Sequence, residues 1–147
     1  MIEFWHLFFT SLAATLAMTA FSYGFSYMVK GNYKEPQLLN YLLAKIPSTK
    51  KSFFKCGDII GWLIHFITGF LFVVLFAIIS FHYSIKSTAG VGLIYGFIIG
   101  LIGVIIWSIL FKLHPSPPKT NRVLFFTQLI IAHIIFGLVM ALILNNF

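Results

Sequence analysis

Charged side chains are scarce in this sequence, and acidic ones are nearly missing. Only 9% of the 147 residues are charged, with three Asp or Glu residues against ten Lys or Arg. A soluble domain carries about 25% charged residues, so this chain cannot cover a water-facing surface. With 60% hydrophobic residues and a mean hydropathy of +0.99, it has the composition of an integral membrane protein.

Cysteine and catalytic patterns are lacking as well. Cys56 is the single cysteine, so the chain can form neither an internal disulfide nor a CxxC redox pair. This excludes the four-helix membrane thiol oxidoreductases, and we interpret Cys56 as a small apolar filler near a helix start. The sequence shows no nucleophile–base pair, phosphate-binding loop or carboxylate pair, so it offers little support for an enzyme and no catalytic residue.

Long apolar runs are what the sequence has instead. A helix needs about 20 mostly apolar residues to cross a membrane, and four stretches qualify: 4–29, 59–81, 89–111 and 123–144. None of them contains Lys, Arg, Asp or Glu. Backbone amides must be paired within the segment in lipid, so each stretch should be a helix. We predict an all-α membrane protein, a four-transmembrane-helix bundle that forms a single domain over residues 1–147.

The basic residues predict the orientation of this bundle. Nine of them fall between spans one and two or between spans three and four, and only Lys86 falls between spans two and three. The nine are Lys30, Lys34, Lys45, Lys50, Lys51, Lys55, Lys112, Lys119 and Arg122. The positive-inside rule then places both termini on the non-cytoplasmic side. The same residues can touch anionic lipid heads, and no nucleic-acid recognition module accompanies them.

The two halves of the sequence, each with two spans, resemble each other. Aligning His65 with His133 matches IHFITGFLFVVLF to AHIIFGLVMALIL, and Gly69 then falls on Gly137. Spans one and three are both followed by a basic, proline-containing loop. We predict two parallel two-helix repeats, about 1–81 and 89–147, related by a pseudo-two-fold axis along the membrane normal.

The connections differ in character. EPQLLNYLLAKIP begins with Glu35 and Pro36, ends near Pro47 and carries leucines at helical spacing, which predicts a short amphipathic helix in the cytoplasmic interface. LHPSPPKTNR predicts an extended, stiff connector. HYSIKSTA is short, so spans two and three should form an antiparallel hairpin.

Small residues recur along each span and should allow close helix packing. We expect the inward faces to carry Ala13, Ala17, Ala20 and Gly24 in span one, Gly57, Gly61, His65 and Gly69 at span two, Gly92, Gly96, Gly100 and Gly103 in span three, and His133, Gly137 and Ala141 in span four. His65 and His133 should therefore both point into the bundle.

Together with the two HxxxG segments, EPQLLN after span one and HPSPP after span three carry a resemblance over nearly the whole chain. The sequence resembles small bacterial four-helix inner-membrane proteins that are grouped as a domain of unknown function. The resemblance implies a multi-pass location in the bacterial inner membrane with paired HxxxG elements. It implies no activity, so it transfers no catalytic residue.

The histidines suggest the leading functional hypothesis. Ionisable groups inside a membrane indicate a functional site by default, although an interhelical hydrogen bond, worth about 0.6 kcal/mol, would also account for them. We expect a non-enzymatic membrane protein that binds a small ligand, a lipid or a partner subunit, with His65, Gly69, His133 and Gly137 as candidate ligand-binding residues. A homo-oligomer is compatible with this hypothesis, and no cofactor is required.

Two alternatives remain open. His65 and His133 could act as the axial ligands of a haem b in an electron carrier, with Gly69 and Gly137 making room for the macrocycle. Alternatively, the chain could be a small proton-linked transporter, since histidine titrates near neutral pH. Against transport, we expect no carboxylate in the interior, because Glu35 lies in a loop and Asp58 should cap span two.

The other histidines give weaker signals. His6 and His82 should lie near the outer surface and are too few for a metal site. His114, which precedes Pro115, should be solvated or bonded to backbone.

Overall fold

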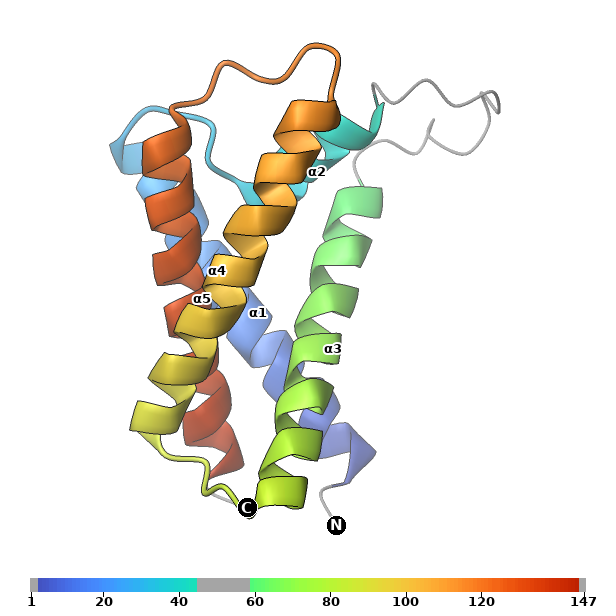
Figure 1. Ribbon diagram of the computed structural model, residues 1–147, viewed down its shortest axis with the longest axis vertical. Coiled ribbons are helices and arrows are strands. Elements are labelled where there is room, and N and C mark those ends of the chain that lie inside the picture. The colour runs from blue at the N-terminus through green and yellow to red at the C-terminus, as the bar shows by residue number, and fades with distance from the viewer. Residues whose placement is uncertain (1–2, 45–58, 146–147) are drawn as a thin grey trace.

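The computed structural model describes residues 3–44 and 59–145, which form five α-helices and no strand (Figure 1). Four helices are long and apolar enough to cross a membrane: α1 (Phe4–Met28), α3 (Ile60–Tyr83), α4 (Ala89–Leu113) and α5 (Arg122–Leu144). The fifth, α2 (Glu35–Ala44), is short. The predicted all-α fold with four spans is confirmed, and the two-repeat organisation stays a prediction.

The long helices run up and down between two ends of the bundle. Both chain termini lie at one end with the 84–88 connection, and we call this the terminal end (Figure 1). The opposite end, which we call the loop end, holds α2 and the 114–121 connection (Figure 1). Local capping fixes the start of α5, because the Asn121 side chain accepts hydrogen bonds from the backbone N–H groups of Val123 and Leu124 at 3.1 and 3.2 Å.

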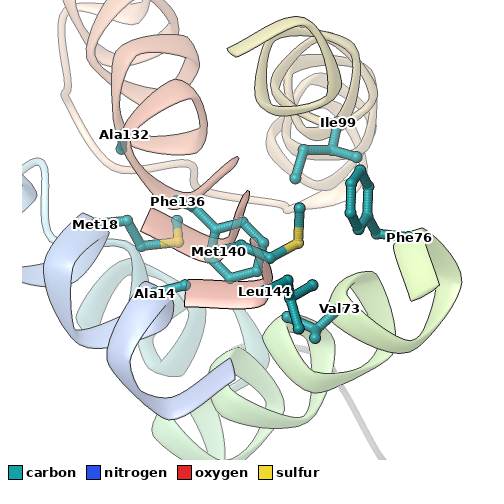
Figure 2. Packing of buried hydrophobic residues seen from close by; sticks show 9 residues of the cluster. All are labelled: Ala14, Met18, Val73, Phe76, Ile99, Ala132, Phe136, Met140 and Leu144. Atoms are coloured by element: carbon teal, nitrogen blue, oxygen red, sulfur yellow. The ribbon is translucent and has the colours of Figure 1, made fainter. Parts of the chain in front are cut away.

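Helix α5 is the centre of the bundle. Half of its most apolar window is buried, against 17% for α3, and it packs on both α4 and α1. Figure 2 shows Phe136 and Met140 of α5 between Met18 of α1 and Ile99 of α4. Side chains from all four spans therefore meet around α5, which explains why its apolar window is the most buried of the four.

Glycines bring the backbones of α4 and α5 into direct contact. A Cβ added to Gly96 would collide with the His133 carbonyl oxygen and lie 2.8 Å from the Ile134 Cα. Gly137 is equally close to Gly92 and Gly96. Because apolar side chains gain nothing by leaving lipid, this close approach supplies the packing contacts that hold the two helices together. The predicted packing role of Gly92, Gly96 and Gly100 agrees with their placement against α5.

The buried face of α1 is lined with hydroxyl groups rather than with alanine and glycine. Our expectation for span one was wrong: Ala20 and Gly24 are exposed, and a Cβ on Gly24 would meet nothing within 4 Å. The buried polar residues of α1 are Thr10, Ser11, Thr15, Thr19, Ser22 and Ser26. Several of these hydroxyls donate a hydrogen bond to the backbone carbonyl one turn earlier, as Thr19 does to the Thr15 carbonyl at 2.7 Å. The remaining lone pairs can then bind groups from other helices.

Helix α2 is inserted into the loop end instead of lying only on its surface. Leu38 and Leu42 are fully or almost fully buried and pack in a cluster with Trp107 and Phe125. The Asn40 Oδ1 accepts a hydrogen bond at 2.6 Å from the backbone N–H of Gly61, in the first turn of α3. Asn40 thus caps α3 from a neighbouring helix. Asp58, the cap predicted from sequence, Gly57 and Cys56 lie outside the described residues.

The glycine contact between α4 and α5 makes a direct prediction. Gly96→Ala should lower the free energy of unfolding by about 1–3 kcal/mol, because the added methyl group meets backbone that cannot move aside. Gly90→Ala on the same helix has open space and should be neutral or slightly stabilising. Denaturant-induced unfolding in detergent measures both, and equal stability of the two variants would contradict the contact.

Candidate functional site

A cavity of about 240 Å³ lies inside the bundle towards its loop end. All five helices contribute to its wall, and α3 and α4 contribute most. Its polar lining residues are Glu35, His65, Thr68 and His133. The rest of the wall is apolar or glycine: Met18, Leu39, Ile64, Gly69, Phe72, Gly103, Ile106, Trp107, Leu110, Leu129 and Phe136.

The cavity exists because α3 and α4 do not close on each other along their whole length. Nearer the terminal end they are linked, since the Tyr95 hydroxyl donates to the Phe72 carbonyl at 2.7 Å and its ring meets Phe76 at 5.0 Å. Closer to the loop end, Ile64 of α3 and Ile106 of α4 line the cavity and are 38% and 49% exposed. The cavity therefore reaches the surface between these two helices, where apolar side chains are exposed.

His65 lines the cavity from α3 and is held by α1. Its Nε2 lies 3.0 Å from the Thr19 Oγ1. The Thr19 hydroxyl already donates its proton to the Thr15 carbonyl, so His65 must donate from Nε2. This fixes the tautomer of a neutral ring and leaves the lone pair on Nδ1 free to accept.

His133 lines the same cavity from α5 in the opposite tautomer. Its Nδ1 lies 2.8 Å from the Leu129 carbonyl oxygen, which can only accept, so Nδ1 carries the proton. The free lone pair is then on Nε2, 3.7 Å from a Cβ placed on Gly103. A Cβ at position 103 would make ordinary van der Waals contact with this ring, so the edge of the His133 ring packs beside Gly103 next to the cavity.

Glu35, the first residue of α2, forms the third polar element of the site. Its side chain is buried, with 3% exposure, and its Oε1 accepts from the Ser22 hydroxyl at 2.8 Å and from Gln128 Nε2 at 2.7 Å. Gln128 Nε2 also donates to the Ser22 Oγ at 2.6 Å. We call Ser22, Glu35 and Gln128 the carboxylate cluster. It joins α1, α2 and α5 in one buried network.

The presence of Glu35 overturns our expectation that the interior holds no carboxylate. The residue does begin the predicted short helix, but that helix carries it into the bundle rather than leaving it in a solvated loop. Burial raises the pKa of the Glu35 carboxyl above its ordinary value of 4.5, although its hydrogen bonds to Gln128 and Ser22 oppose this shift. A proton-exchanging group is therefore available at the cavity wall.

The carboxylate cluster is not satisfied by its own members. Within the described residues, the Glu35 Oε2 and the Gln128 Oε1 are buried and have no hydrogen-bond partner. Reversing the Gln128 amide would not help, because its oxygen would then face the Glu35 Oε1, a second acceptor. Leaving such groups unpaired costs roughly 1–3 kcal/mol each, and more for a charged group, which is typical of a site that awaits a partner.

The structure separates the four candidate residues predicted from the HxxxG segments. His65 and His133 both line the cavity, and so does Gly69, which also approaches the Thr15 side chain of α1. Gly137 is absent from the cavity wall and lies in the α4–α5 contact. Gly103, predicted only for packing, faces the His133 ring. Gly61 contacts α2 rather than another span.

The remaining histidines lie elsewhere. His82 is exposed in the last turn of α3, and His6 belongs to the first turns of α1. His114 is buried and accepts from the Ser116 backbone N–H at 3.2 Å, so the backbone-bonded alternative is the correct one and the solvated one is wrong. In the part of the chain that the structure describes, no three His, Cys, Asp or Glu residues gather into a metal site.

Sequence reasoning missed Glu35, Ser22 and Gln128 as site residues. Gln128 did carry a signal: it is an amide within the apolar span 123–144, and such a group needs a partner at membrane depth. The hydroxyl stripe of α1 was the complementary signal. The sequence around Glu35 gave no such signal, because a glutamate before proline at a helix start is ordinarily explained by the helix dipole.

Comparisons of the chain with protein-family models, with curated proteins and with solved structures found no match. The case for function therefore rests on the cavity and the polar groups around it.

Burial of Glu35 makes stability depend on pH. Since the folded-state pKa is raised, the folded chain binds more protons than the unfolded chain above pH 4.5, and the free energy of unfolding should fall as pH rises towards the raised pKa. The slope from this group is at most about 1.4 kcal/mol per pH unit. Glu35→Gln should remove it, while contributions from the histidines persist in both proteins. The free energy of unfolding of both proteins is measured in detergent as a function of pH. The same pH dependence in the two proteins would contradict the raised pKa of Glu35.

Proposed function

We propose that this protein is a non-enzymatic, multi-pass membrane protein that binds a small, mostly apolar molecule in the cavity between α3 and α4. The polar end of the ligand is held by His65, His133 and Glu35. The observation that carries the proposal is a largely apolar cavity on which three titratable groups converge, with buried acceptor atoms left unpaired beside it. Convergent polar groups in an apolar pocket are the ordinary signature of a ligand site.

The size of the cavity limits the ligand. An engineered apolar cavity of about 150 Å³ accommodates benzene, whereas pockets for drug-sized ligands begin near 300 Å³. A volume of about 240 Å³ therefore suits a substituted single ring or one end of a longer amphiphile. In the second case the rest of the molecule extends into lipid past Ile64 and Ile106.

The geometry supports this proposal over a haem carrier. The Nε2 of His65 is already bonded to Thr19. This imidazole would have to be released from Thr19 before the Nε2 atoms of both histidines could form axial bonds. A Soret band in protein purified from haem-supplied cells would contradict the proposal and revive the haem alternative.

We also propose that the protein lies in the bacterial inner membrane with the loop end in the cytoplasm. The support is the charge distribution: Lys30, Lys34, Lys112 and Lys119 flank the loop end, and Lys86 lies in the 84–88 connection at the terminal end.

Reporter fusions test this orientation. Alkaline phosphatase fused after Phe147 should be active, and a green fluorescent protein in the same place should stay dark, because the C-terminus is expected on the non-cytoplasmic side. The same reporters inserted between Ser116 and Pro117, at the loop end, should give the opposite result. A fluorescent C-terminal fusion would contradict the orientation.

Trp107 provides a reporter for occupation of the cavity. It lines the cavity, whereas Trp5 lies in the first turns of α1 and Trp62 is not among the lining residues. In a Trp5→Phe/Trp62→Phe variant, para-bromotoluene should quench Trp107 fluorescence saturably, because bromine quenches indole on contact.

Adding Gly103→Leu should fill the cavity and reduce the saturable quenching at least about tenfold in apparent affinity, in line with the loss of a well-packed apolar site. Gly90→Leu, on the same helix with open space around it, is the matched control and should leave quenching unchanged. Linear, unsaturable quenching in all three proteins would reject the cavity as a binding site.

A further inference from the structure

Most of the polar atoms left free around the cavity are hydrogen-bond acceptors when Glu35 is ionised. Nδ1 of His65 and Nε2 of His133 carry lone pairs, because each ring uses its other nitrogen as a donor. Glu35 lines the cavity, and the Oε2 of its ionised carboxylate is an unpaired acceptor. Gln128 Oε1 is a second unpaired acceptor of the carboxylate cluster, although Gln128 itself is not a lining residue.

The donors of the carboxylate cluster and of Thr19, in contrast, are used up. Both amide protons of Gln128 are committed, one to Glu35 and one to Ser22. The Ser22 hydroxyl proton is directed at Glu35, and the Thr19 proton is directed at the Thr15 carbonyl. Two donors remain among the lining residues: the hydroxyl of Thr68, which is exposed, and the indole N–H of Trp107 on α4. A partner that completes this site has to bring hydrogen-bond donors.

We infer that the ligand is an amine, whose protonated head group binds at Glu35 while its apolar part fills the cavity. An ammonium group brings three donors and no acceptor, which complements the free atoms of the site. Its positive charge also compensates the Glu35 carboxylate, whose partners, the Ser22 hydroxyl and the Gln128 amide, are neutral. This inference rests on the proposed function and specifies its ligand class.

Binding of an ammonium group at Glu35 involves proton exchange. In the unliganded site the carboxyl is protonated at pH values below its raised pKa. The incoming ammonium keeps its own protons, the carboxyl loses one to solvent, and the charge of the site is unchanged. The affinity for the amine should then rise by up to about tenfold per pH unit until Glu35 is ionised without a ligand.

Other titratable groups surround Glu35 and need a control. Tyr23 of α1 is electrostatically coupled to Glu35, and the Lys34 ammonium lies over the Tyr23 ring at 4.9 Å. His65 of α3 and His133 of α5 share the cavity, and the lining residues of α4 include no titratable side chain. Glu35→Gln leaves all of these groups in place, so a pH effect that this variant abolishes belongs to the carboxyl.

A series of aromatic probes with one ring and different head groups tests the inference. In the variant with Trp107 as its single tryptophan, para-bromobenzylamine, para-bromobenzyl alcohol, para-bromobenzoate and para-bromotoluene are titrated by quenching. The amine should bind at least about tenfold more tightly than the alcohol or the toluene, which corresponds to one charge-assisted hydrogen bond. The benzoate, an acceptor, should bind most weakly.

Substitution of Glu35 provides the decisive comparison. Glu35→Gln has nearly the same shape and keeps an oxygen for Ser22 and Gln128, so it should bind the toluene as before and lose the preference for the amine. Glu35→Asp retains the carboxylate and should retain part of that preference. In weakly buffered solution, the amine should release protons from the protein with Glu35 and none from Glu35→Gln.

The outcomes separate this inference from the proposed function. If all four probes bind saturably with equal affinity and Gly103→Leu blocks them, the cavity binds ligands and the amine assignment is wrong. If the alcohol binds with the same affinity as the amine, the site selects hydrogen-bond donors and not cations, and the amine assignment is also wrong. If no probe binds saturably, the proposed function itself fails. Cooperative unfolding of each variant in detergent shows that a loss of binding does not reflect a loss of fold.

Discussion

The contact between the backbones of α4 and α5 determines the shape of the whole site. Glycines at 92 and 96 let α4 lie directly on α5 near His133 and Gly137. At the level of these glycines Tyr95 also links α4 to α3, whereas towards the loop end Ile64 of α3 and Ile106 of α4 line an open space. The space left between α3 and α4 is the cavity. In lipid, where apolar surface gains nothing from burial, such backbone contacts decide which helices touch and which stay apart.

The same contact explains why a duplicated pattern in the sequence gives an asymmetric bundle. A two-fold axis that exchanges the two halves would make the α1–α5 and α3–α4 interfaces equivalent. The first is extensive and the second is much smaller. The two histidines differ as well, because His65 bonds to Thr19 of another helix and His133 bonds to the carbonyl of its own turn. Whatever the origin of the two halves, they carry different roles: one half supplies α2 and its carboxylate, and the other supplies the tightly packed pair beside it.

The fold could be predicted from the sequence because it follows from composition along the chain. Each span boundary lies within two residues of the helix found, since an apolar run bounded by charges leaves the backbone little choice. The inward placement of His65 and His133 was predicted equally well, because both lie on faces with small residues. The buried face of α1 was predicted wrongly. We judged the residues of span one by their small size alone and therefore placed Ala20 and Gly24, rather than the hydroxyl residues, on the inward face. In lipid, Thr19 and Ser22 are better interior residues because their hydroxyls make hydrogen bonds there: Thr19 donates to the Thr15 carbonyl of its own helix and accepts from His65, and Ser22 donates to Glu35 and accepts from Gln128.

The carboxylate could not be placed from the sequence because its position is a property of the tertiary structure. Helix α2 is short and only moderately apolar, so periodicity describes it as an interfacial helix. Its leucines instead enter the loop end beside Trp107 and Phe125, and the first turn of the helix follows them inward. Glu35 can stay there only because Gln128 and Ser22, from two different spans, meet its Oε1. That leaves one carboxylate oxygen and two imidazole lone pairs without donors in a medium where water is scarce. A buried carboxylate cluster whose own donors are committed and whose acceptors are not is incomplete as a structural network, which is why we infer a cationic partner for it.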